Sequence, residues 1–251
     1  MIHLPAAAAR GAALRLVESL ERRGFARADG PGAGARGAAI VCAEGLPPAA
    51  LERLAAEWSR TGAVRLLVLS RIGAHPDARA PGLRALWELE ERARGTGLPA
   101  LTLRLAPLVG PESPLWLKLA GGPRLPHGGR WLTNPVCEED ALETLARALA
   151  APGVREGWYE VAGSEVLSLA ELAALAVEWG RRSPGLAGAR GAWEPPPEEL
   201  SEHRLCEPGP WLERFGLELA PLAERARGWE PAPRGVAGGG PARAPAGSPA
   251  G

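Results

Sequence analysis

The chain has 251 residues, and its 29 Lys and Arg residues balance 29 Asp and Glu residues, so the formal net charge is zero. A neutral chain gives no electrostatic signal for binding nucleic acid or an anionic membrane, and this length predicts one large domain or a domain with a small appendage. The three cysteines, Cys42, Cys137 and Cys206, are far apart and form no CxxC or Cys/His cluster, which argues against a disulfide framework and against a metal site.

No window of the sequence approaches the ~18 uncharged apolar residues that a membrane-spanning helix needs. The N-terminal segment MIHLPAAAAR has only short apolar runs and does not match a secretory signal. We therefore expect a cytoplasmic protein without a transmembrane segment.

The N-terminal residues predict a strand followed by a helix. Residues 1–4 (MIHL) fit a short first strand, and residues 12–23 fit an amphipathic helix that ends at Gly24, a residue typical of helix C-termini. A dinucleotide-binding fold begins with a unit of this kind.

The next segments predict a short second strand and a taut linker. Residues 25–29 (FARAD) fit the strand, residues 30–37 (GPGAGARG) fit a flexible linker, and residues 38–42 (AAIVC) fit a buried strand. If the linker skips one strand it must cover ~10 Å sideways and ~17 Å back along the sheet, and eight residues reach at most ~28 Å. Without the second strand, the chain would need a left-handed crossover, which is very rare. We therefore favour a surviving second strand.

The middle of the chain alternates helices and strands. Residues 48–61 and 81–95 predict helices, while residues 65–70 and 99–105 predict buried strands with continuous apolar runs. Such alternation predicts an α/β fold with a doubly wound parallel sheet.

The later half predicts further elements and a domain division. Residues 131–152 predict a strand and a helix, and residues 158–182 predict a strand, a turn at Gly163 and a helix. The composition PAPRGVAGGGPARAPAGSPAG cannot bury a core. The predicted parts are a Rossmann-like domain over 1–150, a small C-terminal subdomain over 151–230 and a disordered tail over 231–251.

The most specific pattern lies in residues 63–110. A strand ends in Ser70, a long helix follows, and a second strand containing Arg104 leads to the turn at Gly110-Pro111. This pattern resembles the extended and atypical short-chain dehydrogenase/reductases, the group that includes the NAD-dependent epimerases and dehydratases, the NmrA-like proteins and the complex I 39-kDa-type subunits. The resemblance implies a Rossmann-like NAD(P)-binding fold with a small substrate-side subdomain, here truncated because residues 25–37 replace the region of the second to third strands.

The resemblance also implies a Tyr-x-x-x-Lys pair at the start of the long helix, and this chain lacks it. The two positions hold Gly82 and Leu86, and the chain's single Lys118 precedes its single Tyr159, so no other register restores the pair. In the family the Tyr is the general acid/base, and the Lys lowers its pKa from near 10. Neither Gly nor Leu can transfer a proton, so we predict no catalytic residue.

The phosphate-binding glycines that the resemblance implies are absent too. Their positions fall on Ala7, Arg10 and Ala13, with Gly11 as the only glycine in that loop. Side chains at these places crowd a pyrophosphate, although Arg10 offers it a positive charge. We therefore expect no cofactor, with NAD or NADP as the alternative.

Two residues remain as candidates for a residual cleft. By resemblance, Ser70 stands where the family's Ser/Thr bonds the substrate carbonyl, and Arg104 lies on the neighbouring strand. Glu90 matches an acidic position of the family, but beside Glu88 and Glu91 it predicts a solvated helix face.

Our main hypothesis is a non-catalytic protein of this fold with a structural, assembly or regulatory role. The truncated sheet has an edge that invites a protein partner or self-association. The alternative is an NAD(P)-dependent oxidoreductase, or an epimerase/dehydratase-type enzyme, with an unusual active site. A third possibility is a small-molecule binding module that uses the cleft near Ser70 and Arg104.

Overall fold

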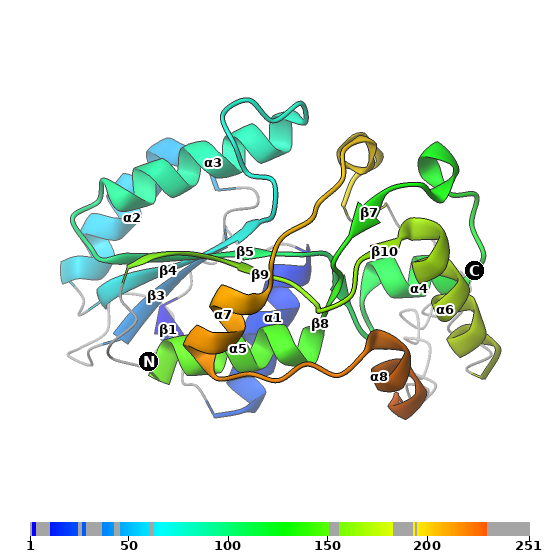
Figure 1. The fold of residues 1–251 in the computed structure, drawn as a ribbon. Helices are drawn as coiled ribbons and strands as arrows, with labels where there is room; N and C mark the ends of the chain where they lie inside the picture. Colours follow the sequence, from blue (N-terminus) through cyan, green and yellow to red (C-terminus); the bar gives the residue numbers. More distant parts are fainter. Residues whose placement is uncertain are drawn as a thin grey trace, which may run out of the picture.

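A parallel sheet with helices on both faces forms the larger part of the molecule, and a small helical part stands at one end (Figure 1). The computed structural model describes residues 2–3, 11–24, 27–28, 37–42, 46–60, 63–150, 156–182, 193 and 195–229. The predicted glycine positions 7 and 10, most of the predicted linker and the tail over 231–251 lie outside these ranges.

The described strands range from two to nine residues and follow the predicted order. They are β1 (Ile2–His3), β2 (Arg27–Ala28), β3 (Gly37–Cys42), β4 (Ala63–Arg71), β5 (Ala100–Leu105), β6 (Leu108–Val109), β7 (Leu132–Thr133), β8 (Val136–Cys137), β9 (Gly157–Val161) and β10 (Leu167–Ser168). The helices alternate with the longer strands. They are α1 (Gly11–Arg22), α2 (Pro48–Arg60), α3 (Pro81–Arg94), α4 (Pro114–Ala120), α5 (Glu138–Ala150), α6 (Leu169–Arg182), α7 (Gly209–Phe215) and α8 (Leu222–Gly228), with two 3₁₀ turns, η1 (Pro126–Gly129) and η2 (Pro197–Ser201).

The main sheet has the order β2-β1-β3-β4-β5-β9, and all its neighbouring strands are parallel. The chain moves outward from β1 to β2, then crosses back to β3 on the other side of β1, so the order reverses between β1 and β3. This confirms the predicted truncated Rossmann-like fold, including the short second strand beside β1. Such a reversal is the topological switch point at which doubly wound sheets bind ligands.

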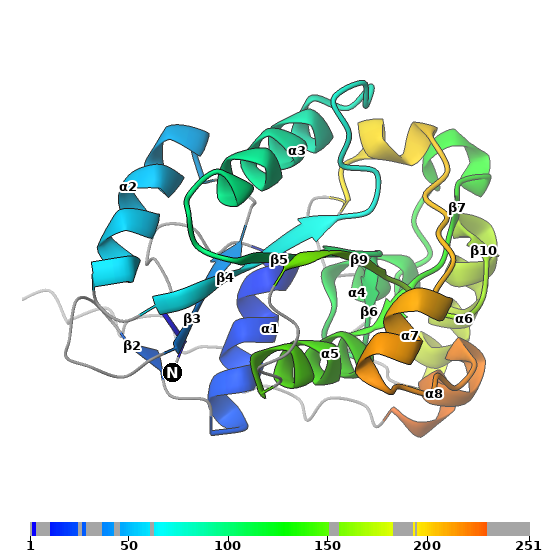
Figure 2. The ribbon, with the colours of Figure 1, turned by 60° about the vertical axis from the view of Figure 1, so that its left-hand side comes forward.

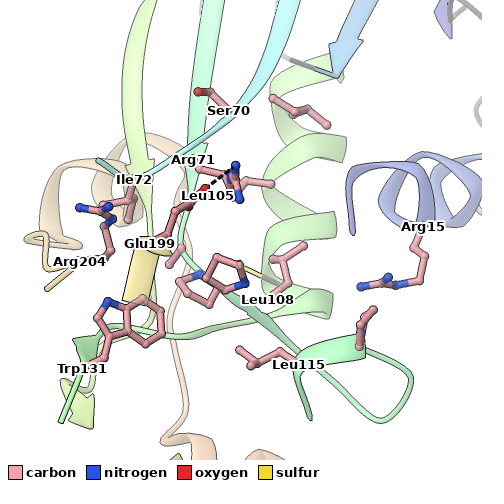
Figure 3. A pocket seen from close by; sticks show the side chains of 15 residues that line it. Arg15, Ser70, Arg71, Ile72, Leu105, Leu108, Leu115, Trp131, Glu199 and Arg204 are labelled. Atoms are coloured by element: carbon pink, nitrogen blue, oxygen red, sulfur yellow. Dashed lines mark ion pairs between the residues drawn. The ribbon is translucent and has the colours of Figure 1, made fainter. Parts of the chain in front are cut away.

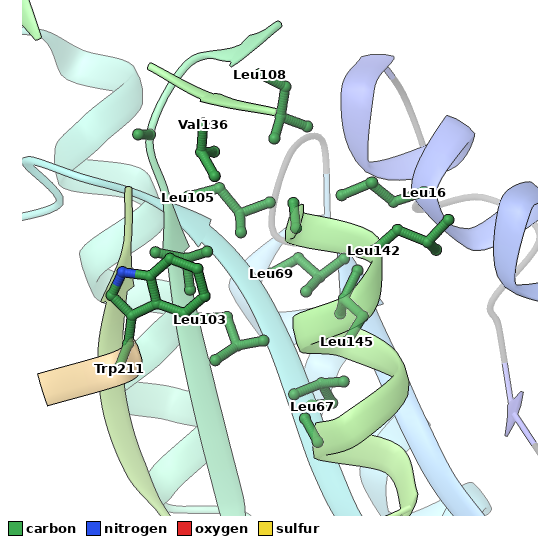
Figure 4. Packing of buried hydrophobic residues seen from close by; sticks show 14 of the residues in the cluster. Leu16, Leu67, Leu69, Leu103, Leu105, Leu108, Val136, Leu142, Leu145 and Trp211 are labelled. Carbon is green, nitrogen blue, oxygen red and sulfur yellow. The ribbon is translucent and has the colours of Figure 1, made fainter. Parts of the chain in front are cut away.

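Strand β4 shows why this sequence forms a central strand. Its side chains alternate between two faces, and both faces are buried, so nearly every residue is apolar. Leu67 and Leu69 pack toward α1 and α5, whereas Leu66 and Val68 pack toward α2 and α3. Figure 4 shows the first of these clusters, and Figure 2 shows the two helix layers on opposite sides of the sheet.

A third apolar cluster builds the small part at the carboxyl ends of the strands. Trp116 of α4 makes edge-to-face contacts with Trp179 of α6 and with Trp229, at ring-centroid distances of 6.2 and 5.0 Å. Two-stranded sheets, β7 with β10 and β6 with β8, support these helices. Helix α4 belongs to the small part although it precedes the predicted boundary at residue 150. Strand β9 follows that boundary but belongs to the main sheet. The chain therefore passes between the two parts more than once.

In the part of the chain that the structure describes, no helix combines the length and the apolar character needed to cross a membrane.

Candidate functional site

A pocket lies at the carboxyl ends of β4 and β5, where the main sheet meets the small helical part (Figure 3). Ligands of open α/β sheets bind at this end of the strands. Most of the wall is apolar and includes Leu105, Leu108, Leu115 and Trp131. The polar lining residues are Arg15, Ser70, Arg71, Glu199 and Arg204.

Ion pairs gather at the polar part of the wall and directly beside it. Arg71 is the last residue of β4, and its Nη2 lies 2.9 Å from Oε1 of Glu199, whose side chain is 4% exposed. Glu202 pairs with Arg79 at 3.1 Å and with Arg204 at 3.5 Å. Residues from β4, the loop before α3 and the segment from η2 onward therefore meet at one place.

Ser70 is the second-last residue of β4 and lines the pocket. It is 3% exposed and alternates with Val68 and Leu66, which places it on the α3 side of the sheet. Its Oγ is buried and has no hydrogen-bond partner among the described residues. The structure therefore keeps this predicted residue at the cleft.

Gly82, where the family resemblance implies a Tyr, lies at the beginning of α3. A Cβ at Gly82 would stand 3.4 Å from Oε1 of Glu199 and 3.6 Å from Nη2 of Arg71. A side chain at this position would thus begin against the Arg71–Glu199 ion pair. Leu86 is 3% exposed and packs in the apolar cluster between α2, α3 and the sheet. Neither position presents a titratable group to the pocket.

Arg104 does not line the pocket. Its guanidinium donates hydrogen bonds to both carboxylate oxygens of Glu90, with Nη2–Oε2 at 2.6 Å and Nε–Oε1 at 3.1 Å, and it stands 4.8 Å from the ring centroid of Trp158. Glu90 is 1% exposed, so the prediction of a solvated face was wrong at this residue. The helix turns Glu90 toward β5, and the buried cation there compensates its charge.

The N-terminal part of the predicted cofactor site is only partly described. Ala7 and Arg10 lie outside the described ranges, and Ala13 belongs to α1, although its side chain is not described. Two residues further along the same helix, Arg15 reaches the pocket wall and pairs with Glu138 at 2.7 Å.

Sequence reasoning missed Arg71, Glu199 and Arg204. Their ion pairs and shared pocket join segments that are more than 120 residues apart, and an arginine-rich chain hides individual arginines. The position of Arg71 directly after Ser70 was the one available signal, because side chains at the ends of parallel strands gather at the ligand edge.

The described residues contain no cluster of three or more His, Cys, Asp or Glu side chains that could hold a metal ion. Cys137 and Cys206 are free thiols.

Burial raises the pKa of the Cys137 thiol from 9.0 to about 12, and neighbouring Asp140 adds to the increase. We therefore expect iodoacetamide at pH 8 to leave Cys137 unmodified in the folded protein and to modify it after unfolding, as measured by peptide mass spectrometry. Between pH 9 and 12 the folded state keeps a proton that the unfolded state releases, so the free energy of unfolding falls as the pH rises through this window. Rapid labelling of the folded protein at pH 8 would contradict the burial of this thiol.

Neither the models of known families nor the curated proteins give a match to this sequence. Solved structures share the fold over 90% of this chain. MoeE5 in complex with UDP-glucuronic acid and NAD has a TM-score of 0.65 at 15% identity, with 96% of its chain covered. The UDP-glucose 4-epimerase of Thermotoga maritima has a TM-score of 0.60 at 13% identity, with 96% covered. WbmH of Bordetella bronchiseptica in complex with NAD⁺ has a TM-score of 0.59 at 17% identity, with 95% covered.

These structures correct our expectation that the chain has no cofactor. MoeE5 and WbmH were both determined with NAD bound, so an NAD-binding fold is indicated. The strand order agrees with this, because the reversal between β1 and β3 is the position at which such folds hold a dinucleotide. Residues 4–10 and 43–45, which follow these two strands, are outside the described residues.

Proposed function

We propose that this chain is a degenerate member of the extended short-chain dehydrogenase/reductase group that binds ligands without oxidising or epimerising them, in a structural, assembly or regulatory role. The observation that carries the proposal is the Arg71–Glu199 ion pair beside Gly82, where the group's catalytic Tyr would begin. Leu86, at the Lys position, supports it because its side chain is committed to the apolar core.

The proposal includes a dinucleotide at the switch point between β1 and β3. When bound, NAD supplies a hydride acceptor, and in the group the Tyr takes the accompanying proton. In this chain, Gly82 and Leu86 occupy the positions of the Tyr and the Lys, and neither side chain can accept that proton. Binding and chemistry are thus separable here, since the fold positions a ligand while the side chains decide its reaction.

A partner protein or a second copy of the chain belongs to the same proposal. The main sheet ends at the two-residue strand β2 on one side and at β9 on the other. Unpaired sheet edges invite association with another chain. Trp158 of β9 supports this, because it is 54% exposed at that edge.

Turnover assays test the absence of chemistry. We expect the full chain with NAD⁺ and UDP-glucose to produce neither NADH, followed at 340 nm, nor UDP-galactose, followed by chromatography, because no base stands at position 82. An active UDP-glucose 4-epimerase serves as the positive control. Separate calorimetric titrations with NAD⁺ and NADH measure binding alone. Steady product formation would overturn the proposal, whereas binding without turnover is the expected result.

The alternative is an enzyme with an unusual active site, and Glu199 is the observation in its favour. Its buried carboxylate lies next to the place of the missing Tyr, with Ser70 on the same pocket wall. If turnover is found, the Glu199→Gln variant should lose it. Glu198→Gln, an exposed neighbour in the same 3₁₀ turn, is the matched control.

A further inference from the structure

The pocket wall contains buried polar groups that still need hydrogen-bond acceptors or donors. Arg204 has a side chain that is 10% exposed, and its Nη2 is buried without a hydrogen-bond partner among the described residues. The Oγ of Ser70 is in the same condition. Buried polar atoms in folded proteins are nearly always paired, so unsatisfied ones at a pocket indicate a ligand group.

Local geometry holds Arg204 in place at this wall. Its backbone N–H donates to the carbonyl oxygen of Leu132 at 2.8 Å, and its guanidinium lies over Gly73. A Cβ at Gly73 would come within 2.8 Å of Nε of Arg204, and the φ of Gly73 is +91°, so glycine serves both the turn and the close approach. The chain thus provides a fitted place for a buried cation beside the pocket.

The charged residues that line the pocket are mostly cationic. They are three arginines, Arg15, Arg71 and Arg204, and one carboxylate, Glu199. A guanidinium presents several N–H donors in a planar fork that matches a carboxylate. The chemistry of this wall therefore suits an anionic group.

The remaining wall suits an apolar body of modest size. Leu105, Leu108, Leu115 and Trp131 surround the space, and each is less than 9% exposed. About 70 Å³ is open to the centres of water-sized molecules, which corresponds to roughly five to seven waters. A six- to seven-carbon acid is of this scale, and a nucleotide sugar is far larger.

We propose that this pocket binds a small organic acid with one carboxylate and an apolar body, and that Arg204 donates hydrogen bonds to the carboxylate. Ser70 lies on the same wall, and its hydroxyl donates a further hydrogen bond to the carboxylate. The inference rests on the proposed ligand-binding function and names the class of ligand for its pocket.

Calorimetric titration of the full chain with benzoate and hexanoate tests the proposal, with benzamide and hexanamide as neutral counterparts. We expect each acid to bind at least about tenfold more tightly than its amide, because only the acid offers Arg204 a charged acceptor for its unpaired Nη2. Arg204→Gln should reduce acid binding to the level of the amide. Arg79→Gln is the matched control, since Arg79 shares the partner Glu202 but is 81% exposed and outside the pocket wall, and it should leave acid binding unchanged.

A second variant keeps the test independent of the stability of Arg204→Gln. Ala106 is 3% exposed and lines the pocket, so Ala106→Leu fills part of the space and should abolish binding of acid and amide alike. Equal affinities for acid and amide, or acid binding that survives both variants, would overturn the inference. Binding of UDP-glucuronic acid but of neither small acid would also overturn it, and would leave the proposed function intact. Chemical conversion of a bound acid would instead overturn the non-catalytic function.

Discussion

Glu90→Gln should lower the free energy of unfolding by about 3 kcal/mol or more, one of the two largest effects that we expect of a single substitution. The carboxylate is 1% exposed and accepts three hydrogen bonds from Arg104. The amide keeps the size but removes the negative charge, so the Arg104 guanidinium, 14% exposed, loses the carboxylate to which it is hydrogen-bonded. Urea denaturation of both proteins, followed by circular dichroism, measures the difference.

Glu91→Gln is the matched control on the same helix. Its carboxylate pairs with Arg94, and both side chains are close to half exposed. Exposed pairs contribute less than about 1 kcal/mol, so this variant should unfold close to the parent midpoint. If the two substitutions cost the same, the ion pair between Glu90 and Arg104 does not stabilise the fold as a buried pair, and the expectation is wrong.

Gly163→Ala should destabilise the protein by about 3 kcal/mol or more, the other large effect. A Cβ at this position would overlap the carbonyl oxygen of Pro135, and neither backbone can yield because the Gly163 N–H donates to the carbonyl oxygen of Asn134 at 3.1 Å. The close contact between Gly163 and the 134–135 segment comes directly after β9. It joins the main sheet to the small part, which carries Trp131 and the other half of the pocket wall. Its disruption should therefore weaken ligand binding as well.

The control for this substitution is Gly228→Ala. Gly228 ends α8, and a Cβ there would meet no atom within 4 Å. The free energy of unfolding of this variant should stay within about 1 kcal/mol of the parent, with a small gain from the better helix propensity of alanine. Thermal and urea unfolding of both variants, combined with titration of benzoate, check stability and binding together. A Gly163→Ala protein as stable as Gly228→Ala would show that the backbone at Gly163 and Pro135 moves apart at little cost, and the expectation would be wrong.

The apolar pattern of the sequence was sufficient for much of the fold. The runs at 65–70 and 99–105 predicted buried parallel strands, and these became β4 and β5. The length of the linker and the rarity of left-handed crossovers favoured a strand at FARAD, and β2 lies beside β1 as that argument required. These predictions succeed because they depend on local periodicity and on the stereochemistry of crossovers, which one sequence already contains.

The site could be predicted only in part. Ser70 was singled out by the family resemblance, which implies a Ser or Thr at the end of this strand, and it lines the pocket. The burial of Glu90 was missed because its neighbours Glu88 and Glu91 are exposed, and only the position of Arg104 on β5 distinguishes it. The expected absence of a cofactor came from a missing motif, and comparison of whole folds corrected it.

By itself, the sequence determined the alternating α/β order, the shortened sheet and the absence of a Tyr-x-x-x-Lys pair, with Gly82 and Leu86 at the two positions. Tertiary structure alone decided which side chains gather beside position 82. Arg71, Glu199 and Arg204 meet because β4 and the segment from η2 onward converge at one end of the sheet. Local preferences along the chain do not encode such a meeting, since it arises from the free energy of packing segments that are more than 120 residues apart.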